Sequence, residues 1–140
     1  MKKLIIALIV FTSLFFTLSL KVGAVQNDAK RIRCTCYIDT GITASGEYTR
    51  NGIIAGRKED LGKKAALYQI NEDGTMGKLI GYYIFLDTGA GMDTDGDGKG
   101  DSIKKGLSID VWKPTLKEAK EWIKKYGDYV YIEIIEQESK

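Results

Sequence analysis

Short apolar runs separated by glycine-rich and polar turns constrain the fold of this 140-residue chain most strongly. Runs of this length with alternating apolar residues are typical of β-strands. We predict strands over residues 32–37, 65–70, 78–86, 107–112 and 129–136. Asn71, Asp73 and Gly74 form a strong turn signal between the second and third of these.

One helix is expected in the C-terminal half. Pro114 interrupts the strand pattern, and Thr115 with Glu118 forms a capping box that begins a helix. Gly127 is suited to end it, and its apolar face consists of Ala119, Trp122, Ile123 and Tyr126. Many short strands, one helix and no βαβ periodicity predict a mainly β fold, built as a small closed barrel.

The N-terminal segment has the order of a secretory signal peptide. Lys2 and Lys3 precede an uncharged apolar run over residues 4–20, and the small residues Gly23 and Ala24 follow. We therefore predict a signal peptide over residues 1–24 and a secreted or cell-wall-associated protein. Because the run is just short of a comfortable membrane span, a retained membrane anchor is the alternative.

Removal of residues 1–24 changes the formal net charge from +2 to −1, because this segment holds three lysines and no acidic residue. A nucleic-acid-binding protein needs a clustered basic surface, so we expect no nucleic-acid partner. The remainder is long enough for one core. We divide it into a linker over residues 25–33 and one domain over 34–136, which we expect to be a monomer.

The two cysteines leave two alternatives open. Cys34 and Cys36 flank one residue of the first predicted strand, so their side chains share a face. Their Cα separation in an extended chain, roughly 6.5–7 Å, is at the edge of disulfide geometry. Both a strained disulfide and two free thiols fit this spacing. The absence of histidine excludes a Cys/His nucleophile and a zinc site.

Two aspartates, Asp87 and Asp110, stand within or directly after apolar runs. A carboxyl group near the end of a buried strand loses hydration, which raises its pKa as a general acid requires. Two such groups suit glycoside chemistry. The alternative is that each aspartate only caps a strand end or a turn.

Three sequence blocks in fixed order resemble the three-aspartate (3D) domain family over about residues 34–135. The blocks are Thr43-Ala44-Ser45-Gly46 with Thr49 and Gly52-Ile53-Ile54-Ala55, then Asp87-Thr88-Gly89, then Ile103-Lys104-Lys105-Gly106 before Ile109-Asp110. The resemblance implies a six-stranded double-psi β-barrel related to the catalytic domain of membrane-bound lytic transglycosylases. The sequence departs from the family pattern at one point: Gly56-Arg57 occupies the position of the first family aspartate, and the nearby Asp60 is out of register with it.

The activity that the resemblance implies is that of a peptidoglycan lytic transglycosylase. Such enzymes cleave the bond between N-acetylmuramic acid and N-acetylglucosamine without water and form an anhydro sugar. Because the nucleophile is the sugar's own C6 hydroxyl, one acid/base residue can suffice without a cofactor. By resemblance, Asp110 is this residue and Asp87 orients it or raises its pKa.

Weaker candidates for substrate contacts are Thr43, Thr49, Lys104 and Trp112; the last could stack on a sugar ring or belong to the core. A competing hypothesis is a non-catalytic module that binds cell-wall glycan or a surface partner, which the missing first aspartate favours. A third is a calcium-stabilised structural or secreted interaction domain whose barrel has lost its site.

An insertion over residues 92–102 has the pattern of a calcium loop. Positions 1, 3, 5 and 9 are Asp93, Asp95, Asp97 and Asp101, Gly98 takes the turn position, and Lys99 can offer its carbonyl. Four carboxylates packed this closely repel one another unless a cation neutralises them. Lys104 replaces the usual glutamate at position 12. We predict a structural Ca²⁺, with a solvated acidic loop as the alternative.

Overall fold

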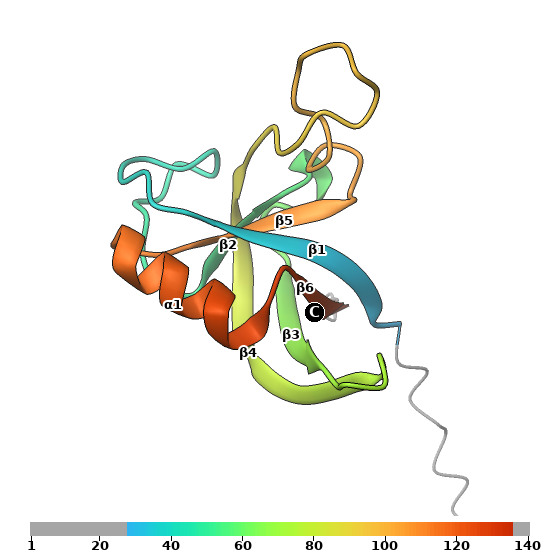
Figure 1. Ribbon diagram of the computed structural model, residues 1–140. Helices are drawn as coiled ribbons and strands as arrows, with labels where there is room; N and C mark the ends of the chain where they lie inside the picture. The colour runs from blue at the N-terminus through green and yellow to red at the C-terminus, as the bar shows by residue number, and fades with distance from the viewer. Residues whose placement is uncertain (1–27, 136–140) are drawn as a thin grey trace, which may run out of the picture.

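The computed structural model describes residues 28–135 (Figure 1), so the predicted signal peptide and Glu136 lie outside the described residues. The elements are β1 (Lys30–Tyr37), β2 (Ile53–Gly56), the 3-10 helix η1 (Lys58–Asp60), β3 (Lys64–Ile70), β4 (Met76–Thr88), β5 (Ser108–Trp112), α1 (Leu116–Tyr126) and β6 (Tyr129–Ile135). Across the described residues the fold is therefore mainly β with one α-helix, as predicted. β1 begins within the stretch predicted as linker.

The six strands close into a ring in the order β1-β5-β2-β4-β3-β6, with β6 paired to β1. The pairs β1–β5 and β2–β4 are parallel, and the other four are antiparallel. β2 was not predicted from the sequence. It has four residues, all of them buried, and therefore lacks the alternation that marks a half-exposed strand.

The interior of the ring is filled by alternate residues of the strands. Cys34, Ile54, Leu67 and Val111 are completely buried there. Trp122 of α1 packs against this cluster, so the helix covers part of the core. Both ends of α1 form as predicted: Thr115 Oγ1 accepts a hydrogen bond from Glu118 N (3.2 Å), and Gly127 has a positive φ of 78°.

Both cysteines are free thiols that face the interior cluster. Burial raises the pKa of Cys34 well above its usual value and that of Cys36 to about 11. A thiol with a raised pKa is protonated at neutral pH and weakly reactive. The cysteines are therefore packing residues in this structure.

A second, smaller cluster lies on the opposite face of the strands, under the loop over residues 38–52. It contains Ile53, Leu86 and Trp112, each next in sequence to an interior residue. Trp112 is 6% exposed, and its indole N–H donates to the carbonyl of Asp39 (2.9 Å). Within residues 28–135, no helix has both the length and the apolar character needed to cross a membrane.

Candidate active site

The strand register aligns four residues in a row across four neighbouring strands. Thr35 of β1 lies opposite Asp110 of β5, Asp110 lies opposite Ala55 of β2, and Ala55 lies opposite Asp87 of β4. Residues that oppose one another point to the same face of a sheet. Because Val111, the neighbour of Asp110, is interior, the row lies on the outer face.

The two predicted catalytic aspartates are thus brought together, with the small side chain of Ala55 between them. Two strand spacings, in total roughly 9–10 Å, separate their Cα atoms. An irregularity in the β2–β4 pairing after Ile54 makes Asp87, and not Leu86, the partner of Ala55. Bulges of this kind redirect a side chain to another face.

Asp110 is a half-buried carboxyl group without a neutralising partner. The Thr35 hydroxyl forms a hydrogen bond with its Oδ1. No lysine or arginine within residues 28–135 forms an ion pair with it. Burial therefore dominates and raises its pKa, as the sequence predicts for an aspartate inside an apolar run.

Asp87 has a different environment, because three donors hold its carboxylate. The Tyr37 hydroxyl donates to Oδ2 (3.0 Å), and the backbone N–H groups of Ala44 (3.0 Å) and Thr88 (2.9 Å) donate to Oδ1. Burial, followed by the hydrogen bond to Asp87, raises the pKa of the Tyr37 phenol. The phenol therefore stays protonated and can donate its hydrogen bond to Asp87.

The loop over residues 38–52 contacts Asp87 through Ala44. Its shape depends on Thr43 and Thr49, the two threonines predicted as substrate contacts. The buried Thr43 hydroxyl donates to the carbonyl of Glu47 (2.9 Å), and Thr49 Oγ1 accepts from Gly41 N (3.2 Å). Both hydroxyls are thus engaged within the loop and position the Ala44 N–H. Lys104, the third candidate substrate contact, is exposed on the segment before β5.

Asp60 does not take the position of the first aspartate in the 3D family pattern that this sequence resembles. It is 3% exposed and accepts hydrogen bonds from Arg57 (2.7 and 3.2 Å) and Lys63 (2.8 Å). Burial works against its charge, but these two cations outweigh burial and lower its pKa. Both carboxylate oxygens are occupied in this ion-pair network. Asp60 therefore stabilises the fold and does not belong to the row of residues that contains Asp87 and Asp110.

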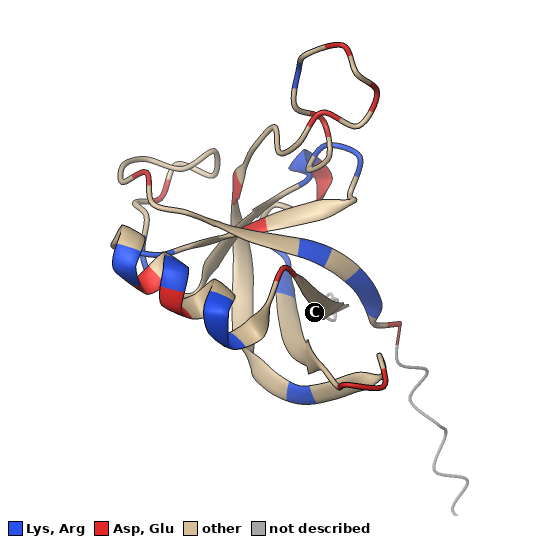
Figure 2. Cartoon of the chain, in the orientation of Figure 1, with Lys and Arg blue, Asp and Glu red and all other residues tan. Residues whose placement is uncertain are grey.

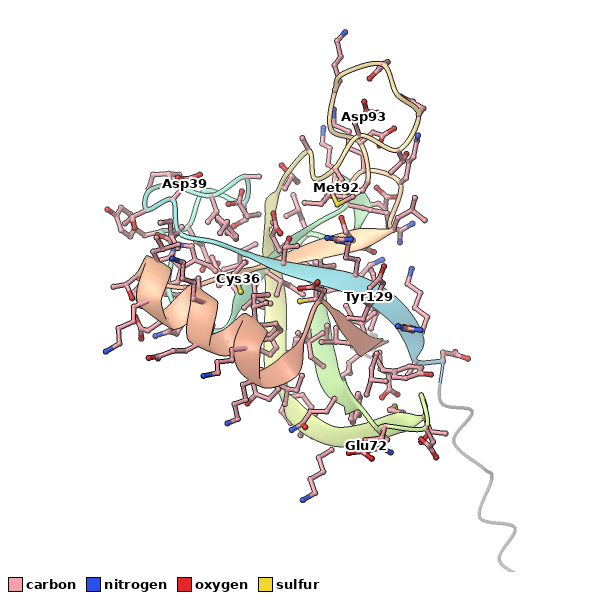
Figure 3. The ribbon with its side chains drawn as sticks, viewed as in Figure 1. Cys36, Asp39, Glu72, Met92, Asp93 and Tyr129 are labelled. Carbon is pink, nitrogen blue, oxygen red and sulfur yellow. The ribbon has the colours of Figure 1, made fainter. Side chains whose placement is uncertain are left out.

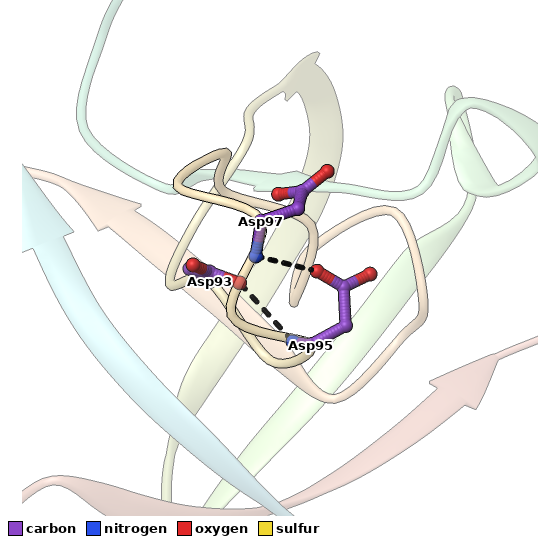
Figure 4. A group of neighbouring side chains, drawn as sticks. All are labelled: Asp93, Asp95 and Asp97. Atoms are coloured by element: carbon purple, nitrogen blue, oxygen red, sulfur yellow. Dashed lines mark hydrogen bonds between the residues drawn. The ribbon is translucent and has the colours of Figure 1, made fainter.

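The insertion gathers three of its predicted ligands. Carboxylate oxygens of Asp93, Asp95 and Asp97 lie within 4.8 Å of one another and could hold a metal ion (Figure 4). Asp93 also accepts backbone hydrogen bonds from Gly96 (2.7 Å) and Gly98 (2.8 Å). The loop rises from the ring beyond Met92 and Asp93 (Figure 3).

Asp101 is held away from this group by interactions that the sequence pattern did not reveal. It forms an ion pair with Lys105 and accepts hydrogen bonds from the Thr94 N–H (2.9 Å) and hydroxyl (2.7 Å). Lys105, followed by Thr94, lowers its pKa to about 2. Lys105 also forms an ion pair with Asp95, with 3.3 Å between Nζ and Oδ2.

Lys99, predicted to offer its backbone carbonyl to the ion, uses its backbone N–H within the loop: this group donates a hydrogen bond to Asp97 Oδ1 (2.8 Å).

Comparisons with family models, with curated proteins and with solved structures found no match to this chain. The resemblance to the 3D family therefore depends on the sequence blocks. Sequence reasoning missed Thr35, Tyr37 and the Ala44 N–H as partners of the aspartates. Thr35 and Tyr37 are two positions apart in β1, but only the register across the ring connects them to distant carboxyls.

Proposed function

We propose that this domain is an exported peptidoglycan lytic transglycosylase of the 3D type. The observation that carries this proposal is the pair of neighbouring aspartates with opposite environments: Asp110 has a raised pKa from burial, and Asp87 accepts three hydrogen bonds. Titratable pairs with contrasting surroundings are typical of acid–base sites. The two parallel strand pairs are compatible with a double-psi barrel.

In the proposed reaction, protonated Asp110 donates its proton to the glycosidic oxygen as the bond to the muramic acid C1 breaks. The resulting carboxylate then takes the proton of the C6 hydroxyl, whose oxygen attacks C1 and closes the 1,6-anhydro ring. Asp110 is protonated again at the end, so the reaction consumes no water. Asp87, held in place by its three hydrogen-bond donors, stabilises the positive charge that develops on the sugar ring.

A binding module is the second candidate function, because Gly56 and Arg57 stand where the 3D family has its first aspartate and Asp60 is engaged elsewhere. Incubation of the exported protein with purified peptidoglycan, followed by mass spectrometry, distinguishes the two. Our proposal expects 1,6-anhydro-muropeptides as products. Saturable binding to glycan strands without any anhydro product would contradict it and select the binding module.

We further propose that the group Asp93, Asp95 and Asp97 binds a structural Ca²⁺. With the glutamate of position 12 missing, a weak extracellular-type Kd of about 10⁻⁴–10⁻³ M is expected. At 10 mM Ca²⁺ this predicts a stabilisation of about 1.4–2.7 kcal/mol, measured as a rise in melting temperature.

The calcium response has two controls. Asp95→Ala with Asp97→Ala should remove it, whereas Glu72→Ala, an exposed acidic residue in another turn, should leave it intact. Mg²⁺ at the same concentration should stabilise less, because it dehydrates reluctantly. A melting temperature that does not change with Ca²⁺, or one that rises equally in the double variant, argues against the site.

A further inference from the structure

A groove of about 470 Å³ lies between α1 and β1. Thr35 and Cys36 line it from the strand, and Ala119 and Ile123 contribute apolar surface from the helix. Figure 3 shows Cys36 in the space between these two elements. Because Cys36 is a protonated thiol and the helix side is aliphatic, the floor of the groove is apolar.

The rim of this groove is charged. Lys120 and Lys124 line it and are exposed. They are four positions apart, so they lie on the same helix face and repel each other. Within residues 28–135 neither has an ion-pair partner, in contrast to Arg57, Lys63 and Lys105. Figure 2 shows the basic segments along α1. Asp128 adds one carboxylate to the lining.

The groove shares a wall with the proposed acid site. Thr35 lines the groove, and its hydroxyl forms the hydrogen bond with Asp110 Oδ1. A molecule in the groove would therefore lie on the other side of residue Thr35 from the acid/base carboxyl. This position is suited to a substituent of the sugar ring on which Asp110 acts.

We propose that the groove binds the short peptide that N-acetylmuramic acid carries on its lactyl group. This inference rests on the proposed function and names the part of the substrate that the groove recognises. Such a peptide has methyl side chains for the apolar floor, carboxylates for Lys120 and Lys124, and an amino group for Asp128. The site would then select glycan strands that retain their peptides over stripped strands.

The test compares peptide-bearing glycan strands with strands stripped of peptide by an amidase. The variant is Lys120→Ala/Lys124→Ala in the exported protein, and the control is Lys78→Ala/Lys117→Ala. The control makes the same change in charge, and neither of its residues lines the groove. Alanine favours helix, so α1 should remain folded. Binding is measured in an Asp110→Asn background, and release of anhydro products is measured with Asp110 intact.

We expect the groove variant to bind peptide-bearing strands about three- to tenfold more weakly, the range for two exposed ion pairs, with no change for stripped strands. The control should bind both as the parent does. If the parent binds peptide-bearing and stripped glycan strands equally well, the groove assignment is overturned, even if anhydro products form. It is also overturned if the groove variant loses the same amount of binding to both kinds of strand. Peptide-dependent binding without any anhydro product overturns the transglycosylase and retains the groove.

Discussion

Asp110→Asn is expected to reduce release of 1,6-anhydro-muropeptides by about 10²–10⁴-fold, the usual contribution of general acid–base catalysis. The amide is nearly isosteric with the acid and can keep the hydrogen bond from Thr35, but it cannot transfer a proton. The measurement is mass spectrometry of peptidoglycan incubated with equal amounts of wild type and variant. Unchanged product release would remove Asp110 from the mechanism.

The same variant should be more stable than the wild type at neutral pH, which separates loss of chemistry from loss of fold. A carboxyl group whose pKa is raised by folding costs no stability below its unfolded pKa of about 3.9, and the cost grows as pH rises through the folded value. Asparagine carries no such cost. We expect the variant to be more stable than the wild type at pH 7 and equally stable near pH 3, measured by thermal melts.

Phe85→Ala is expected to cause a large loss of stability, about 3–5 kcal/mol. The Phe85 side chain is 2% exposed and lies in the interior cluster, so its removal leaves a cavity. Denaturant unfolding at 25 °C gives the free energy of unfolding. Tyr82→Ala on the same strand is the control: its side chain is 66% exposed, so a change within about 0.5 kcal/mol is expected.

Gly56 extends this prediction, because a Cβ at this position would collide with the Phe85 ring. Gly56→Ala alone should cost about 1–3 kcal/mol through overpacking. In the Phe85→Ala background the added methyl group enters empty space, so the penalty should vanish. Additive effects in this double-mutant cycle would contradict the close packing of these two residues.

The sequence pattern located β1, β3, β4, β5, β6 and α1, because alternation, turn residues and caps are local signals. β2 escaped detection for a physical reason. Its four residues, Ile53–Gly56, are buried on both faces, and an apolar run this short has no period to read. The parallel pairing of β2 with β4 also has no local signal, because closure of the ring determines it.

The candidate site shows the same division between local and distant signals. Asp87 and Asp110 were identified because apolar runs flank them, and the blocks around them resemble a family. Their surroundings depend on residues far away in the chain: Thr35 contacts Asp110 across 75 positions, and Tyr37 contacts Asp87 across 50. Thr43 was a candidate substrate contact from its block alone, and its burial within the loop could not be read from the sequence.

The row Thr35–Asp110–Ala55–Asp87 joins strands in the order β1, β5, β2 and β4, in which no two neighbours are consecutive in the chain. No hairpin can therefore form any part of the row by itself. We therefore expect Asp110 to acquire its buried surroundings, and with them its raised pKa, only once these long-range pairings exist. The pKa of this one carboxyl, measured by NMR, would therefore report whether the ring is closed in a given state of the protein.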